Sequence, residues 1–314
     1  MKRAPSGWSG RNDGEGAEHL RWHNAIRPWP DIPGESGTVL LGFSSDEGVR
    51  RNLGRPGARK APDALRWALS SMAIHNSGPL YDAGDICVEG EELENGQLEF
   101  GDMLAQILAA GNFTVGLGGG HEITYASYLG FKKASLNTQS ERWGIINLDA
   151  HFDNRQADRA SSGTGFFQIH EDALRDAIDI KYLTLGISSP SNTQILFERA
   201  NEIGIDYVTD EQLNRHGASL GERVVGDFLE QIDHLYLTVD IDVLPASVAP
   251  GVSAPAAYGV PLEVVRACIL NIAESSKLRH ADFAELNPEF DIDQRTARTA
   301  ARLIHDLVTT RSEI

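Results

Sequence analysis

Short apolar segments, bounded by Gly, Asn or Asp, recur along the chain with the length and composition of buried strands. The clear ones span residues 39–43, 114–117, 143–148, 182–186, 235–239 and 281–286, and two weaker ones span 79–86 and 205–208. Patterns typical of helices lie between them, at residues 61–72, 102–110, 123–132, 171–178, 193–203, 220–232, 261–275 and 296–309. About eight strands that alternate with helices predict an α/β fold, with a parallel sheet covered on both faces.

The N-terminal segment, residues 1–37, differs from the rest of the chain. It is polar and rich in Gly, and it carries Trp8, Trp22 and Trp29, which we interpret as anchors of a wrapping arm. No internal repeat and no linker rich in Pro and Ser divides the chain. The sequence therefore predicts one domain over residues 1–314, with residues 1–37 as an N-terminal arm.

Composition and charge argue against several classes of protein and partner. No apolar run approaches the roughly 20 residues that a membrane span needs, and no hydrophobic stretch follows Lys2 and Arg3 as in a secretory signal. Cys87 and Cys268 are far apart in sequence, so we expect no disulfide framework and a cytoplasmic location. The net charge of −17 argues against nucleic acid or an anionic membrane as a partner.

Polar side chains gather where three of the predicted strands end. The segments are Gly-Gly-Gly-His-Glu at 118–122, Asn-Leu-Asp-Ala-His-Phe-Asp at 147–153 and Thr-Val-Asp-Ile-Asp at 238–242. In an open α/β sheet, ligands bind outside the carboxyl ends of the strands. The glycines before the histidine could indicate a phosphate loop, but no Gly-Lys-Ser/Thr follows them. A metal site explains all three segments together, whereas each motif alone would be weak.

The charge of these residues predicts a pair of metal ions. If the strand continues through Asp149, His151 and Asp153, alternation points all three side chains to one side, and Asp240 and Asp242 repeat this pattern. Carboxylates so close would repel one another unless cations lay between them. Two divalent ions neutralise the four aspartates, and the preponderance of carboxylates favours manganese over zinc. The glycines would let the imidazole of His121, the sixth ligand, reach the same place.

These motifs resemble those of the ureohydrolase family, which includes arginase and agmatinase. Gly84-Asp85, Ala249-Pro250-Gly251 and the stretch 285–288 also match. The resemblance implies an arginase-like three-layer α/β/α sandwich and a homo-oligomer. It also implies two Mn²⁺ ions, the first held by His121, Asp149, Asp153 and Asp240, and the second by Asp149, His151, Asp240 and Asp242. By the same resemblance Asp153 would carry protons and Glu285 would orient a cationic amidine.

Within that family, four further segments resemble the formimidoylglutamase branch, which forms glutamate and formamide in histidine degradation. They are residues 8–13, 20–23, 45–52 and 161–164. Gly165 departs from that branch, where proline is more usual. The stretch Gly165-Phe166-Phe167 lacks the proton-shuttling histidine that arginase carries near this loop, which argues against arginase. The implied substrate is a small anionic amidino compound, N-formimidoyl-L-glutamate.

A substrate with carboxylates needs a basic clamp, for which the sequence offers Arg50, Arg51 and Arg155. We also expect the turn of Ser162, Gly163 and Thr164 to contact the substrate. Surface ion pairs and an ordinary turn are the simpler interpretations of these residues. Two alternatives stay open: a ureohydrolase that releases urea from guanidinobutyrate, agmatine or arginine, and an inactive metal-binding relative that regulates or scaffolds a partner.

Overall fold

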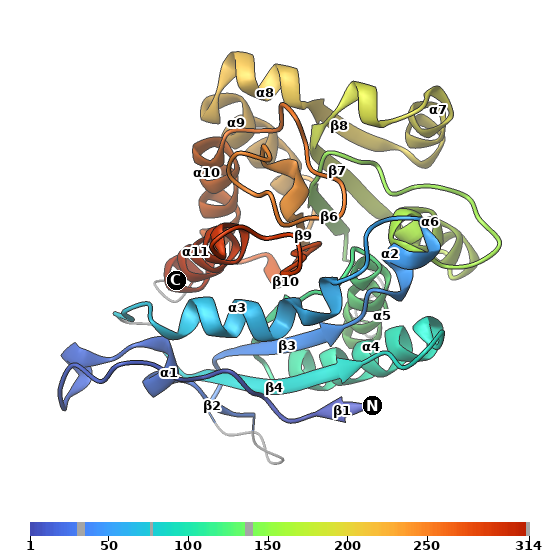
Figure 1. The fold of residues 1–314 in the computed structure, drawn as a ribbon. Coiled ribbons are helices and arrows are strands. Elements are labelled where there is room, and N and C mark those ends of the chain that lie inside the picture. The colour runs from blue at the N-terminus through green and yellow to red at the C-terminus, as the bar shows by residue number, and fades with distance from the viewer. Residues whose placement is uncertain (30–34, 76–77, 136–140, 312–314) are drawn as a thin grey trace.

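The computed structural model describes residues 1–29, 35–75, 78–135 and 141–311, and one ten-stranded sheet runs through them (Figure 1). Eight strands form its parallel body in the order β4-β3-β5-β10-β9-β6-β7-β8. Their bounds are β3 Thr38–Ser44, β4 Leu80–Cys87, β5 Phe113–Leu117, β6 Trp143–Leu148, β7 Ile180–Ile187, β8 Ile205–Thr209, β9 His234–Asp240 and β10 Leu278–Ala284. These are the eight predicted segments, including both weaker ones.

Two short strands that the sequence did not predict come from the N-terminal segment. β1 (Lys2–Arg3) pairs antiparallel and β2 (Arg27–Pro28) pairs parallel with the outer edge of β4. The tryptophans of this segment are anchored as expected: Trp8 donates a 2.7 Å hydrogen bond to Asp82, and Trp22 is fully buried. The arm therefore covers an edge whose backbone groups would otherwise be unpaired.

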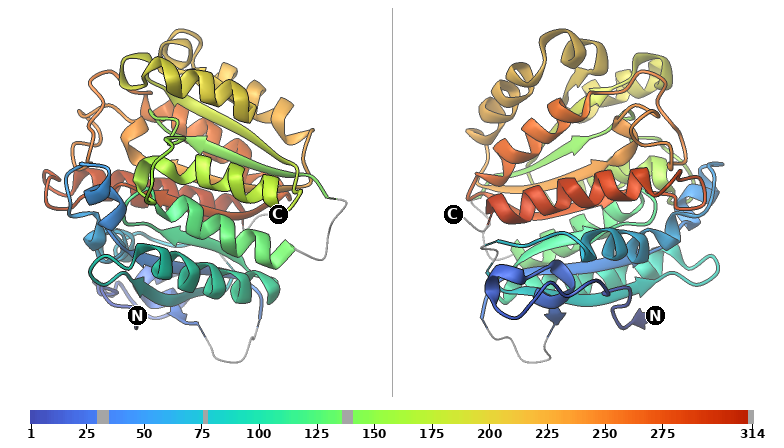
Figure 2. Two further views of the ribbon diagram at one scale, coloured as in Figure 1. Left: turned by 90° about the vertical axis from the view of Figure 1, so that its right-hand side faces the viewer. Right: turned by 60° about the vertical axis from the view of Figure 1, so that its left-hand side comes forward.

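Helices cover both faces of the sheet (Figure 2). One face carries α3 (Ala61–Ser70), α9 (Ala218–Leu229), α10 (Leu262–Ala273) and α11 (Arg295–Arg311). The other carries α4 (Leu93–Ala109), α5 (Ile123–Ser135), α6 (Gly165–Arg175) and α7 (Gln194–Ile203). The remaining helices are α1 (Trp22–Ala25), α2 (Glu47–Arg51) and α8 (Asp210–His216). The predicted three-layer α/β/α architecture is confirmed.

The strands are apolar throughout because both faces of the sheet are buried. In β6 the side chains of Ile146 and Leu148 join the core under α3, α9, α10 and α11, whereas Trp143 and Ile145 join the core under α4 to α7. Alternation therefore assigns Asn147, which follows Ile145 by two residues, to the second face. This places the polar residues of the central strands under α5.

Two helices begin well before the predicted residue, each for a local reason. α4 begins at Leu93 rather than at 102, since buried Leu93, Gln97 and Phe100 extend its inner face by two turns. α6 begins at Gly165 rather than at 171, directly after a 3-10 turn with a reciprocal Ser161–Thr164 capping box. Among the described residues, no helix is both long and apolar enough to cross a bilayer.

Candidate metal centre and substrate pocket

The loop after β5 brings His121 to the carboxyl edge of the sheet. A Cβ on Gly119 would lie 1.9 Å from the carbonyl oxygen of Ser45, so only glycine allows this close approach. The loop is fastened to the residue after β10 by two hydrogen bonds: the His121 N–H donates to Glu285 Oε1 at 2.8 Å, and the Glu285 N–H donates to the Gly119 carbonyl at 2.9 Å. The predicted role of the glycine run is therefore visible in the backbone.

The aspartates converge by turns, which corrects our expectation of continued strands. β6 ends at Leu148, and Asp149 Oδ1 accepts the N–H of His151 at 2.7 Å, which closes a turn. Asp240 is the last residue of β9, and its Oδ1 likewise accepts the N–H of Asp242 at 2.9 Å at the start of a 3-10 turn. Each carboxylate thus caps the turn that presents the next ligand.

Two groups of side chains could each hold a metal ion among the described residues: His121, Asp149, Asp153 and Asp240 in the first, and Asp149, His151 and Asp242 in the second. In the first group His121 Nδ1 lies 2.8 Å from Asp153 Oδ2, 3.2 Å from Asp149 Oδ2 and 3.3 Å from Asp240 Oδ2.

In the second group His151 Nδ1 lies 3.4 Å from Asp149 Oδ1 and 3.3 Å from Asp242 Oδ2. Asp149 therefore turns one carboxylate oxygen to each group, as a bridging ligand would. Asp240 belongs to the first group only, so its expected second role as a bridge stays a prediction.

The electrostatics of this cluster favour bound cations. Burial and the nearby Asp149 carboxylate raise the pKa of Asp153, and burial with Asp242 and Asp149 raises the pKa of Asp240. Although burial opposes its ionisation, the two histidines lower the pKa of Asp149. Buried Asp242 Oδ1 has no hydrogen-bond partner among the described residues. Carboxylate oxygens with two imidazole nitrogens are a donor set that suits manganese or zinc, so the residues fit a divalent metal.

A buried polar chain orients His121 from beneath. His121 Nε2 lies 3.0 Å from Thr238 Oγ1, which donates to Asp282 Oδ1 at 2.7 Å. Asp282 also accepts hydrogen bonds from Tyr236 and Ser127, at 2.7 and 2.5 Å. Since Thr238 uses its hydroxyl proton on Asp282, it accepts from His121 Nε2, which leaves Nδ1 free as a metal ligand. Sequence analysis missed this chain, although Tyr236 and Thr238 precede the predicted ligand Asp240 at intervals of two residues, on the same side of β9.

A pocket of about 320 Å³ opens beside the metal cluster. Its lining includes seven of the predicted site residues, namely His151, Asp153, Arg155, Ser162, Asp240, Asp242 and Glu285. Burial and the nearby Glu122 carboxylate raise the pKa of Glu285 to about 8. Its Oε2 is buried without a hydrogen-bond partner in the described part of the chain. Glu285 and Asp153 also have positive φ angles, 65° and 45°, a strain found mainly at functional sites.

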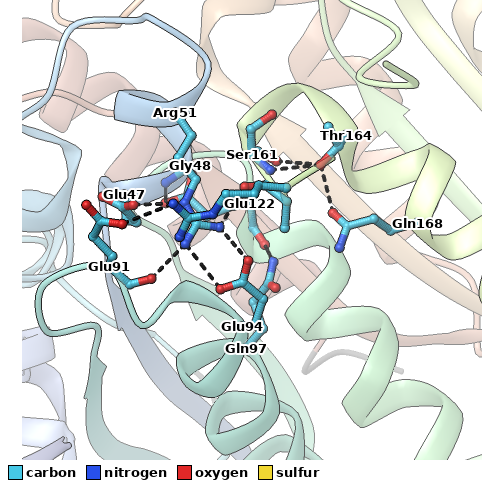
Figure 3. Close-up of polar contacts among 12 residues, drawn as sticks. Glu47, Gly48, Arg51, Glu91, Glu94, Gln97, Glu122, Ser161, Thr164 and Gln168 are labelled. Atoms are coloured by element: carbon cyan, nitrogen blue, oxygen red, sulfur yellow. Dashed lines mark hydrogen bonds and ion pairs between the residues drawn. The ribbon is translucent and has the colours of Figure 1, made fainter. Parts of the chain in front are cut away.

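The three predicted clamp arginines lie in different surroundings. Arg155 lines the pocket, and no described carboxylate is paired with it. Arg50 forms a bidentate pair with Glu47, at 2.6 and 2.7 Å. The side chain of Arg51 is 6% exposed, and it also bonds to Glu47, at 2.8 Å (Figure 3). Arg50 and Arg51 are therefore absent from the pocket lining, in contrast to our expectation. The sequence placed these arginines after a strand, but it did not show that they pair with Glu47 of the same helix, α2.

Only part of the turn that we expected to contact the substrate lies at the pocket. Ser162 lines the pocket, but Gly163 and Thr164 do not. The carbonyl of Gly163 accepts the N–H of Arg155 at 2.9 Å, and Thr164 Oγ1 accepts the N–H of Ser161 at 2.9 Å. The structure thus gives Thr164 a partner within the turn and gives Gly163 a partner at the start of the preceding loop. Polar pocket residues that sequence analysis missed are Asn52, Arg55, Ser191, Asn192 and Ser253.

Comparison with known proteins identifies the family. The model of the arginase family matches residues 36–309. The chain belongs to the arginase family. Two curated relatives cover almost its whole length: the formimidoylglutamase of Rhodococcus jostii (strain RHA1) is 51% identical over 99% of this chain and 97% of its own. That of Aeromonas salmonicida (strain A449) is 45% identical over 96% of each chain. The resemblance seen in the sequence motifs is confirmed.

Solved structures share the arginase-family fold. The formimidoylglutamase of Bacillus subtilis subsp. subtilis str. 168 superposes with a TM-score of 0.82 at 22% identity, over 99% of this chain and 96% of that one. The formiminoglutamase of Trypanosoma cruzi, solved with Mn²⁺, gives 0.80 at 24% identity, over 90% of this chain and 96% of that one. At such identities the likeness is one of fold.

Proposed function

We propose that the chain is a formimidoylglutamase, a hydrolase that converts N-formimidoyl-L-glutamate and water to L-glutamate and formamide. The proposal rests on one observation: three kinds of functional group line the same pocket. They are a buried Asp/His cluster, the unpartnered Glu285 Oε2 and the cationic Arg155. The names of relatives 45 to 51% identical along nearly the full chain support it.

We propose two Mn²⁺ ions as the cofactor, held by the two groups of ligands around His121 and His151. A pair of divalent ions supplies water of lowered pKa, from 15.7 toward about 7, and stabilises negative charge that develops on oxygen. The formiminoglutamase of Trypanosoma cruzi was solved with Mn²⁺, which supports this choice of metal. The two oxygens of Asp149, one near His121 and the other near His151, support two sites rather than one.

The chain's own residues then orient the substrate. The amidinium of the formimidoyl group donates to Glu285 Oε2, and its positive charge favours the ionised form of this carboxyl group, whose pKa is about 8 without it. This contact holds the formimidoyl carbon toward the metal cluster. Arg155 binds a carboxylate of the glutamate part, and Ser162 contributes a hydroxyl to the same wall. Arg55, which lines the pocket without a carboxylate partner among the described residues, adds a second positive charge. These contacts select an anionic amidine over agmatine, which has no carboxylate.

Asp153 moves the proton. Its carboxylate borders the pocket and lies 2.8 Å from His121, at the place where water would attack. We propose that it accepts a proton from the attacking water and gives it to the α-nitrogen of glutamate as the C–N bond breaks. Glutamate leaves with that proton on its amine. The oxygen of water loses its second proton to solvent as the carbonyl forms, and the formimidoyl carbon leaves as formamide with that oxygen.

Turnover of a substrate panel tests this function. Manganese-loaded protein should form formamide and glutamate from N-formimidoyl-L-glutamate, and no urea from agmatine, arginine or guanidinobutyrate. Urea from any guanidino compound, without turnover of the first substrate, would replace this proposal with the guanidino hydrolase. No turnover of any of the four, with two metals bound, would favour the inactive relative. Assembly into a homo-oligomer and a cytoplasmic location stay predictions.

A further inference from the structure

Arg51, the last residue of α2, has a buried guanidinium in which every N–H group is used. Nε donates to Glu47 at 2.8 Å, Nη1 donates to Glu94 at 2.5 Å and to the Ala160 carbonyl at 2.9 Å, and Nη2 donates to the Glu91 carbonyl at 2.6 Å and to Glu94 at 3.1 Å (Figure 3). Its side chain is only 6% exposed. Five donors with five acceptors leave none for a substrate.

The acceptors of Arg51 lie on three segments that are far apart in sequence. They come from α2, from the start of α4 with the turn before it, and from the loop 154–161. That loop follows the metal-binding Asp153 and begins with Asn154 and the pocket residue Arg155. At its start, Asn154 is fixed to α7 through Leu196, at 3.0 Å. At its end, the Ala160 carbonyl is held by Arg51.

An ion pair near the end of this loop is weaker than the contacts of Arg51. Arg159 pairs with Glu91 at 3.0 Å, but both side chains are more than half exposed, and exposed ion pairs contribute only about 0–1 kcal/mol. The side chain of Arg51 is instead only 6% exposed, although that of Glu94 is about half exposed. A planar guanidinium also matches the two oxygens of Glu94 in a way that lysine cannot. Lysine has three donors, so at least two of the five acceptors would lose their partner.

We propose that Arg51 is a positioning residue, which fixes loop 154–161 against α2 and α4 and so sets the place of Arg155 and Ser162 in the pocket wall. Asp153 is held independently, because its carbonyl accepts the N–H of Phe166 at 3.0 Å. Loss of Arg51 should therefore loosen substrate binding more than the chemical step. The kinetic part of this inference rests on the proposed function, whereas its structural part does not.

Two measurements on Arg51→Lys test the role. Hydrogen–deuterium exchange of the substrate-free protein should rise in peptides from residues 154–163. The KM for N-formimidoyl-L-glutamate should rise about tenfold, with kcat changed less than about threefold and manganese affinity unchanged. Arg159→Lys is the matched control, with the same substitution on the loop itself, and should leave exchange and KM within about twofold of wild type.

The outcomes separate the alternatives. A higher KM with wild-type exchange of the loop would overturn the proposal and make Arg51 a direct substrate ligand. Unchanged exchange and unchanged KM would also overturn it. Should Arg51→Lys fail to fold, Glu94→Gln weakens the same contact from a half-exposed side chain, and a rise in loop exchange is again expected. If the wild-type protein does not act on the substrate, the proposed function fails, but the exchange measurement still decides the role of Arg51.

Discussion

Replacement of Glu285 by glutamine should remove substrate orientation while the fold stays intact. The side chain is 4% exposed, its Oε1 accepts the N–H of His121, and its Oε2 has no partner in the described part of the chain. Glutamine keeps the shape and, with its oxygen accepting the N–H of His121, turns an NH₂ group to the amidinium. A charge-assisted hydrogen bond contributes about 1.5–3 kcal/mol, and an uncompensated buried charge costs about 3–5 kcal/mol.

A loss of about 3 kcal/mol corresponds to about a hundredfold fall in kcat/KM, since each 1.36 kcal/mol is tenfold. The assay is formamide release by manganese-loaded Glu285→Gln, with Tm and manganese affinity measured beside it. Glu122→Gln is the matched control, because Glu122 is also a buried glutamate with an unpartnered oxygen but bonds to Ser45 and Gly48 outside the pocket. An equal loss in both variants, or less than about threefold in Glu285→Gln, would refute the reasoning.

Three further predictions concern metal binding and stability. Thr238→Val removes the acceptor of His121 and should weaken manganese binding, measured by calorimetry, about 10- to 100-fold. Thr238→Ser keeps the hydroxyl and should bind manganese like wild type. Equal manganese affinities of the valine variant and wild type would contradict the role of the buried polar chain. Burial raises the pKa of Asp153 and Asp240, so the metal-free fold favours their protonated forms and loses stability as they ionise. The rise in Tm on adding manganese should therefore be larger at pH 8 than at pH 6, and a smaller rise would contradict this sign. Burial raises the pKa of Asp210 to about 6, above its unfolded value of about 4, so its ionised form opposes folding. Asp210→Asn should match wild type near pH 4 and gain about 1–2 kcal/mol above pH 7, whereas an equal gain at both pH values would exclude this cause.

The sheet could be predicted because its signal is local. Each central strand is an apolar run that ends at a polar residue, and β6 was predicted at Trp143–Leu148, as observed. The N-terminal strands β1 and β2 are two residues each and hydrophilic, so no apolar run marks them. Their pairing depends on the free edge of β4, which only the assembled sheet provides.

The sequence predicted the candidate metal ligands better than it predicted the residues that line the substrate pocket. The sequence named His121 and Asp149 because polar residues directly follow buried strands. It could not separate Arg51 from Arg155, because both are arginines that follow a predicted strand near the same edge of the sheet. Their difference lies in Glu47 and Glu94, one of which is distant in sequence from Arg51 and becomes its partner only through the packing of α4.

The most direct test of the central claim is the fate of the formimidoyl group in water labelled with heavy oxygen. Manganese-loaded protein acting on N-formimidoyl-L-glutamate should give formamide that carries the label, unlabelled glutamate and no ammonia, and the metal-free protein should give none of these products. Ammonia together with N-formylglutamate would show that the other C–N bond breaks, and turnover after removal of all metal would show that the Asp/His cluster is not the reaction centre. Either result would contradict the account.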